Sequence, residues 1–213
     1  MTQPPPLLPL SPQPPAPPPP PPSVAAEPRG LVITVAGATG GAGTTTIAAL
    51  LADAITHRTG NPVCAIDHVG GTFSSRLATT HPASRFIVHD LGPLAAVAAR
   101  QTTTPERRTI IVTSPDAGAA DLALDSLRHL AANTPIPPPD QHQTAQHLII
   151  VNTTSRHKPP QTATRRLQAQ APGAAVIALA WDPALATAGP IDHTAVTAET
   201  IDTVARALQQ IGV

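Results

Sequence analysis

Short apolar runs alternate with longer amphipathic segments along most of this chain. Runs rich in β-branched residues predict buried strands, and apolar residues at three- and four-residue spacing predict helices. Strands are expected at 31–35, 62–66, 85–89, 109–113, 147–152 and 174–180, and helices at 44–55, 91–100, 117–132, 161–170 and 194–211. Such an alternation is typical of a parallel sheet covered on both faces. The pattern predicts a three-layer α/β fold with a mostly parallel sheet flanked by helices.

The first 28 residues differ in composition from the rest of the chain. Residues 1–22 contain 13 prolines, and proline can neither donate to a sheet nor occupy a helix interior. We therefore expect a disordered, extended tail over 1–28. Its PxxP spacings suit aromatic grooves of partner proteins, and a plain spacer is the other interpretation. Residues 29–213 are long enough to form one domain.

The charge and cysteine content limit which partners and which cellular compartment suit the protein. Thirteen Lys and Arg balance thirteen Asp and Glu, so no overall field favours nucleic acid or anionic lipid. Cys64 is the sole cysteine, which excludes an internal disulfide and suits a reducing compartment. The sequence has neither the pattern of a signal peptide nor the ~18-residue apolar run of a spanning helix. We expect a cytoplasmic protein, whose scarce Lys and absent Tyr are typical of a GC-rich bacterial genome.

A glycine-rich turn joins the first predicted strand to the first predicted helix. Gly37, Gly40, Gly41 and Gly43 all lie in it. Glycine reaches positive φ and lets the backbone approach a ligand closely, and a helix N-terminus offers unpaired N–H groups and a positive dipole end. The turn predicts a phosphate-binding strand–loop–helix unit. A glycine-rich turn without a ligand is the alternative.

Polar residues stand where the predicted strands end. Ligands of parallel sheets bind at this carboxyl edge, and the glycine-rich turn is expected there too. The residues concerned are Asp67, Asp90, Ser114, Asn152, Trp181 and Asp182.

Residues 40–46, GGAGTTT, resemble the GGxGKTT loop of the ParA/MinD family of deviant Walker A ATPases. In that family an aliphatic strand ends in Asp about 27 positions after the first glycine, and Asp67 stands 27 positions after Gly40. Further segments match in the same order: FIVHD ending at Asp90, LIIVN ending at Asn152, AWDP at 180–183 and GPI at 189–191. The resemblance spans about residues 31–211 and implies a P-loop NTPase-like domain.

The resemblance also implies roles for individual residues. Mg²⁺ would be held by the Thr45 hydroxyl and the Asp90 carboxylate, and Asn152 would contact the purine. The alternatives are a helix cap for Thr45, a solvated acid for Asp90 and a loop cap for Asn152. The phosphates of ATP or ADP would lie on the backbone of Gly40, Gly41, Ala42, Gly43, Thr44, Thr45 and Thr46.

Three charged residues of the family pattern are replaced in this chain. Thr39 and Thr44 stand where the family has lysines, and Val69 stands where it has a water-orienting Asp. Threonine carries no charge, and phosphoryl transfer depends on positioning and charge stabilisation. We expect weak or no ATP hydrolysis, and a positioning, scaffold or accessory role in secretion, partitioning, division or DNA transfer. Protein partners and a homodimer are expected, without nucleic acid or membrane.

Two other functions fit the same residues. The spacing Gly37-x-x-Gly40-x-x-Gly43 also matches the dinucleotide fingerprint of short-chain-dehydrogenase-like NAD(P) domains, although a chain without Tyr lacks their catalytic Tyr. A nucleotide-free interaction module is the third interpretation. His68, His81 and His89 lack metal-ligand spacing and predict surface or structural roles. Trp181 would stack on a base or anchor a loop.

Overall fold

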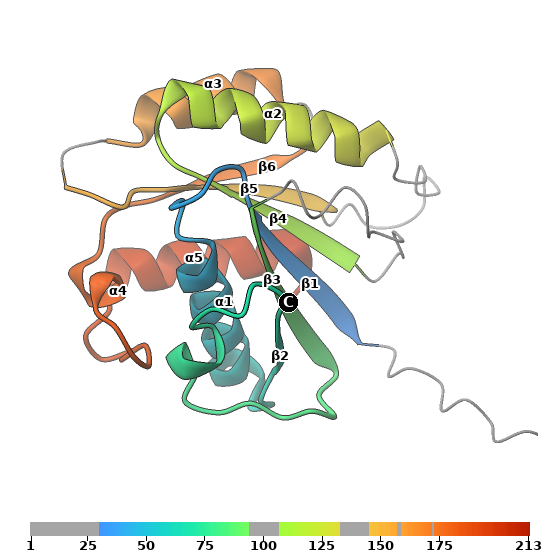
Figure 1. Cartoon of the computed structure of the whole chain (residues 1–213), viewed down its shortest axis with the longest axis vertical. Coiled ribbons are helices and arrows are strands. Elements are labelled where there is room, and N and C mark those ends of the chain that lie inside the picture. The colour runs from blue at the N-terminus through green and yellow to red at the C-terminus, as the bar shows by residue number, and fades with distance from the viewer. Residues whose placement is uncertain (1–29, 94–106, 133–144, 157–158, 172) are drawn as a thin grey trace, which may run out of the picture.

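Six parallel strands form the central sheet of the computed structural model, which describes residues 30–93, 107–132, 145–156, 159–171 and 173–213 (Figure 1). The strand order is β2-β3-β1-β4-β5-β6. The bounds are β1 Leu31–Gly37, β2 Cys64–Asp67, β3 Phe86–Pro93, β4 Arg107–Thr113, β5 His147–Asn152 and β6 Ala175–Leu179. Every strand pair in the sheet is parallel, as the sequence predicts.

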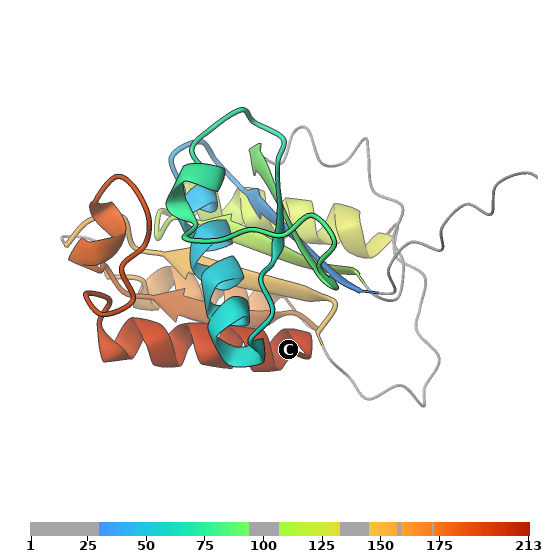
Figure 2. The ribbon, with the colours of Figure 1, turned by 90° about the horizontal axis from the view of Figure 1, so that it is seen from below.

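Helices cover both faces of the sheet and complete three layers (Figures 1 and 2). Helices α1 (Thr44–Thr59) and α5 (Ala198–Ile211) pack on one face, and α2 (Ala117–Ala132) and α3 (Gln161–Gln170) pack on the other. Successive strand residues point to opposite faces, so Ile110 faces α1 while Ile111 faces α2, and both are fully buried. Two shorter pieces, η1 (Ser74–Arg76) and α4 (Pro183–Ala186), lie in connecting segments.

Strand β3 corrects the sequence-based prediction in this region. A helix was expected over 91–100, but residues 91–93 continue β3, and residues 94–100 lie outside the described ranges. Strand β3 lies between β2 and β1, and Pro93 is the register partner of Gly37. At residues 91–93 strand pairing therefore replaces the predicted helix, and Gly92-Pro93 is in any case a poor helix start.

Smaller corrections concern where elements begin. Strand β2 starts at Cys64 and not at residue 62, because Pro62 has no N–H for the ladder. Helix α5 starts at Ala198 and not at residue 194. Its N-cap is Thr197, whose side chain accepts a hydrogen bond from the Thr200 amide. The proline-rich tail lies outside the described residues.

The order of the first three strands separates the two nucleotide-binding folds that the glycine spacing allowed. The dinucleotide-binding order places the second strand beside the first, as 3-2-1-4-5-6. Here β3 lies beside β1, and β2 is the edge strand. The dehydrogenase-like fold is therefore wrong for this chain.

Candidate functional site

The glycine-rich loop runs from the end of β1 to the first turn of α1. Gly41 and Gly43 adopt positive φ values of 76° and 83°, which glycine tolerates best. Gly43 is the N-cap residue of α1, and no side chain caps this helix end. The helix interior starts at Thr44, so the proposed cap role of Thr45 is wrong. The first amides of α1 are thus not hydrogen-bonded by a capping side chain, and such a helix end suits an anion.

Asn152, at the end of β5, holds this loop in place. Its Nδ2 atom donates a hydrogen bond of 2.8 Å to the Ala42 carbonyl, and the residue is only 7% exposed. A Cβ atom on Gly43 would lie 2.3 Å from the same Nδ2. The side chain therefore anchors the loop, as the loop-cap alternative predicted, and only glycine leaves room for it.

Thr45 and Asp90 meet as the magnesium hypothesis requires. The Thr45 hydroxyl donates a 2.6 Å hydrogen bond to Asp90 Oδ2, and Asp90 Oδ1 accepts one from the Gly92 amide. Asp90 is fully buried, so the solvated-acid alternative is wrong. It lies inside β3 beside Asp67 and not at the strand end. A buried carboxylate with neutral donors, next to a hydroxyl, fits the all-oxygen chemistry of Mg²⁺.

The residues that replace the family's charged groups take other contacts. Thr44 is mostly buried, and its hydroxyl lies where a Cβ on Gly37 would approach within 2.4 Å. The side chain thus packs against the end of β1. Val69 is half-exposed, its methyl groups lie over Gly92, and its amide donates to Asp67 Oδ1 at 2.9 Å. Asp67 therefore anchors its own turn.

A cavity of about 250 Å³ adjoins the loop at the carboxyl ends of β5 and β6. Thr46 and Gly43 form its wall on the loop side, and Trp181 lies on the other, with the Arg156 guanidinium 4.3 Å from its ring centroid. The remaining lining residues are Arg76, Asn152, Thr153, Thr154, Ala180, Asp182, Leu185 and Ala186. Among the predicted loop residues, Gly40 and Gly41 are exposed and Ala42 is buried.

Arg76 is a charged lining residue that no sequence pattern indicated. The residue is 9% exposed and donates to the carbonyls of Leu185 at 2.8 Å and Thr187 at 3.1 Å. Burial lowers the pKa of this guanidinium. Its contacts fix the α4 segment over the cavity.

Asp182 also holds the α4 segment in place, through hydrogen bonds to Ala184 and Thr197. Its carboxylate accepts hydrogen bonds of 2.9 Å from the Ala184 amide, the Thr197 amide and the Thr197 hydroxyl. Burial alone would raise the pKa of Asp182, but these bonds, together with one from the Thr200 hydroxyl, lower it. Asp182 therefore ties α4 to the start of α5.

His68 and His89 form a structural pair. His68 Nε2 and His89 Nδ1 are 2.8 Å apart, and the two rings stack. Burial, with His68 and Arg107 nearby, lowers the pKa of His89 to about 4. His89 is therefore neutral at neutral pH. His81 is exposed, and its Nδ1 accepts from the Ala83 amide at 3.2 Å.

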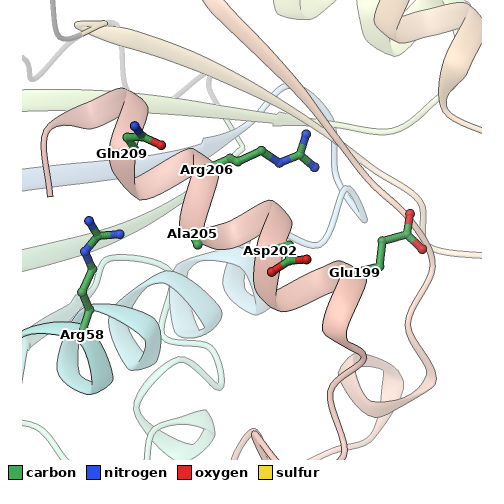
Figure 3. Close-up of a pocket in the computed structure, with 6 residues that line it drawn as sticks. All are labelled: Arg58, Glu199, Asp202, Ala205, Arg206 and Gln209. Atoms are coloured by element: carbon green, nitrogen blue, oxygen red, sulfur yellow. The ribbon is translucent and has the colours of Figure 1, made fainter.

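A larger hollow of about 730 Å³ lies between the end of α1 and α5 (Figure 3). It is lined by Arg58, Glu199, Asp202, Ala205, Arg206 and Gln209. The apolar side of α5 packs in the core through Val204, Ala207, Leu208 and Ile211. No helix in the described ranges has the length and apolar content to cross a membrane. Arg58 places the hollow at the end of α1 opposite the glycine-rich loop.

Comparison with known proteins identifies the fold. No family model and no curated protein matches the chain. The cell division ATPase MinD of Pyrococcus furiosus aligns over 85% of this chain and 98% of its own, at 15% identity and a TM-score of 0.58. A ParA family ATPase from Chlorobium tepidum aligns over 85% and 99%, at 15% identity and 0.57. MinD of Pyrococcus horikoshii in complex with Mg-ADP aligns over 85% and 95%, at 15% identity and 0.52. The chain therefore has the ParA/MinD-like P-loop fold that its motifs predict.

Proposed function

We propose that this protein binds ATP or ADP at residues 40–46 and hydrolyses ATP weakly or not at all. The observation that carries the proposal is the uncapped N-terminus of α1, which lies beside the buried Thr45–Asp90 pair. The helix end supplies amides for phosphate, and the oxygen pair supplies ligands for Mg²⁺. Bound there, Mg²⁺ would neutralise charge on the phosphates. The Mg-ADP bound to the similarly folded MinD supports this ligand class.

The cavity beside the loop is the proposed place of the nucleoside. It adjoins Gly43 and Thr46, so a nucleotide with its phosphates on the loop would extend its base toward β5 and β6. Trp181 offers a flat apolar face at this cavity. Asn152 also lines the cavity, and its Nδ2 uses one N–H on the Ala42 carbonyl, so its second N–H and its Oδ1 remain the groups proposed to contact the base.

The proposed cellular role is that of a cytoplasmic positioning, scaffold or accessory factor. Thr39, Thr44 and Val69 supply none of the charges that hydrolysis needs, so a binding role suits the chain better than turnover. Protein partners are proposed to bind through the proline-rich residues 1–28, and a homodimer is proposed for the domain.

We expect no phosphate release above background when the full chain is incubated with ATP and Mg²⁺. The uncharged side chains at 39, 44 and 69 leave the transition-state charge without its usual partners. A steady-state phosphate-release assay tests this, with Asp90→Ala as the control that removes the proposed Mg²⁺ ligand. Turnover in the wild type that Asp90→Ala abolishes would show an active ATPase and contradict the proposal.

Thr44→Lys is expected to tighten ATP binding by about 10–100-fold, because a charge-assisted contact contributes roughly 1.5–3 kcal/mol. The wild type should bind ATP and ADP with similar affinity, since its loop has no cation for the γ-phosphate. The lysine should favour ATP over ADP. Calorimetric titration measures both, and phosphate release should stay at background because Thr39 and Val69 remain.

Thr44→Met is the matched control, because it adds length without charge. Equal gains in the Met and Lys variants would show that charge is not the cause. If neither the wild type nor Thr44→Lys binds ATP or ADP, the loop is only structural and the interaction-module interpretation holds.

A further inference from the structure

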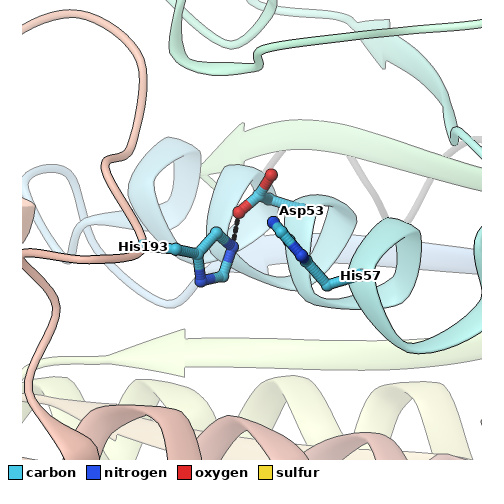
Figure 4. Close-up of side chains that lie close together, drawn as sticks. All are labelled: Asp53, His57 and His193. Atoms are coloured by element: carbon cyan, nitrogen blue, oxygen red, sulfur yellow. Dashed lines mark ion pairs between the residues drawn. The ribbon is translucent and has the colours of Figure 1, made fainter.

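A second cluster of ligand-type side chains lies away from the phosphate loop (Figure 4). Asp53 and His57 are one helical turn apart on α1, which places them on one face. His193 comes from the segment between α4 and α5 and points at them (Figure 4). One ligand atom from each residue lies within 4.8 Å of the other two. Three donors from two separate parts of the chain thus converge.

The cluster lies at the edge of the buried core: Asp53 is buried, His193 is half-buried and His57 is exposed. Asp53 is 9% exposed, and its Oδ2 forms an ion pair with His193 Nε2. Neither buried atom has a hydrogen bond to any other described residue. The rings of His57 and His193 meet edge to face, with centroids 4.3 Å apart. Burial raises the pKa of Asp53, although His193 and His57 lower it.

The two nitrogen donors and one carboxylate favour Zn²⁺ over Mg²⁺ and Ca²⁺. Two imidazoles and one carboxylate suit Zn²⁺, which commonly takes three protein ligands and a water. Magnesium and calcium prefer oxygen ligands and fit poorly. Tetrahedral ligation at about 2.0–2.1 Å places donor atoms roughly 3.4 Å apart. The exposed His57 side chain can reach that spacing by rotation.

We propose that Asp53, His57 and His193 bind one Zn²⁺ ion, which fastens the segment between α4 and α5 onto α1. The same segment continues from the cavity wall at Asp182, Leu185 and Ala186. The ion would therefore hold one side of that cavity without touching the phosphate loop. The site does not depend on nucleotide binding.

Zinc binding to the full chain tests the proposal. Metal-stripped protein is titrated with Zn²⁺ in competition with a chromogenic chelator, and with Co²⁺ as a spectroscopic probe of ligand geometry. One Zn²⁺ per chain is expected, with a raised melting temperature. His57→Gln and His193→Gln should each weaken binding by at least about 100-fold, since even outer-shell changes cost 10–100-fold. His57 is exposed, so its replacement leaves the fold intact.

His68→Gln and His81→Gln are the matched controls, because they remove imidazoles elsewhere. Both variants should bind Zn²⁺ like the wild type. Loss of binding in His68→Gln, with retention in His57→Gln, would place the ion at the His68–His89 pair and overturn the proposal. Absence of binding at micromolar Zn²⁺ would overturn it as well.

Discussion

Gly43→Ala is expected to destabilise the protein by about 2–4 kcal/mol. Gly41→Ala should lose less stability, because it adds only the strain of an alanine at positive φ and no collision. Both glycines have positive φ. Only at Gly43 would a Cβ collide with Asn152 Nδ2, at 2.3 Å, while nothing lies within 4 Å of a Cβ at Gly41. Asn152 cannot withdraw without releasing the Ala42 carbonyl. Urea denaturation measures the free energy of unfolding of both variants.

Two further variants make this comparison decisive. Gly40→Ala is the baseline, since Gly40 has neither a positive φ nor a neighbour within 4 Å. In an Asn152→Ala background the collision disappears, so Gly43→Ala should then cost no more than Gly41→Ala. Equal losses at 41 and 43 in the wild-type background would show that Asn152 does not constrain the loop. Nucleotide affinity should fall together with stability in Gly43→Ala.

Asp182→Ala is expected to destabilise the protein by about 3 kcal/mol, because each hydrogen bond to a charged group contributes about 1.5–3 kcal/mol and neighbouring bonds do not add fully. The change leaves the amides of Ala184 and Thr197 without their acceptor in a site where Asp182 is 3% exposed. Chemical denaturation at neutral pH measures the loss. Asp192→Ala is the matched control, since exposed Asp192 makes a similar pair of bonds to Thr194. It should change stability little.

The contribution of Asp182 should also depend on pH. Its pKa in the folded protein lies below the unfolded value of about 3.9, so the stabilisation is fully present above that value. It is lost as the pH falls through the folded pKa. The difference in unfolding free energy between the wild type and Asp182→Ala should therefore shrink below about pH 4. A difference that stays constant into acid would mean that the ionised carboxylate is not what stabilises this segment.

Much of the architecture is predictable from local sequence. Continuous apolar runs give the strands, because buried parallel strands must be apolar on both faces. The helix predicted over 91–100 is wrong at residues 91–93, which continue β3 because Pro93 pairs with Gly37. The pairing of β3 with β1 is a property of the whole sheet, and no single run of residues indicates it.

In the candidate site, too, some features follow from the sequence and others do not. The Thr45–Asp90 contact was expected from the motif order, and the structure places the two side chains in a hydrogen bond. The anchoring of Ala42 by Asn152 and the placement of Arg76 over the cavity depend on side-chain directions that spacing does not give. Spacing alone does not indicate the cluster proposed to bind zinc, because His193 is distant in sequence from Asp53 and His57, although the four-residue spacing of those two is a visible signal.

The strand order has a consequence for how this protein folds during translation. Strand β1 is an inner strand of the sheet, and both of its neighbours, β3 and β4, come later in the chain. The chain must therefore be synthesised through β3, which begins at Phe86, before β1 can hydrogen-bond on either side. Until then only α1 can cover the apolar side chains of β1, because helices form within microseconds whereas strands pair slowly with distant partners. The nascent chain should thus be most prone to aggregation, and most dependent on chaperones, during that interval.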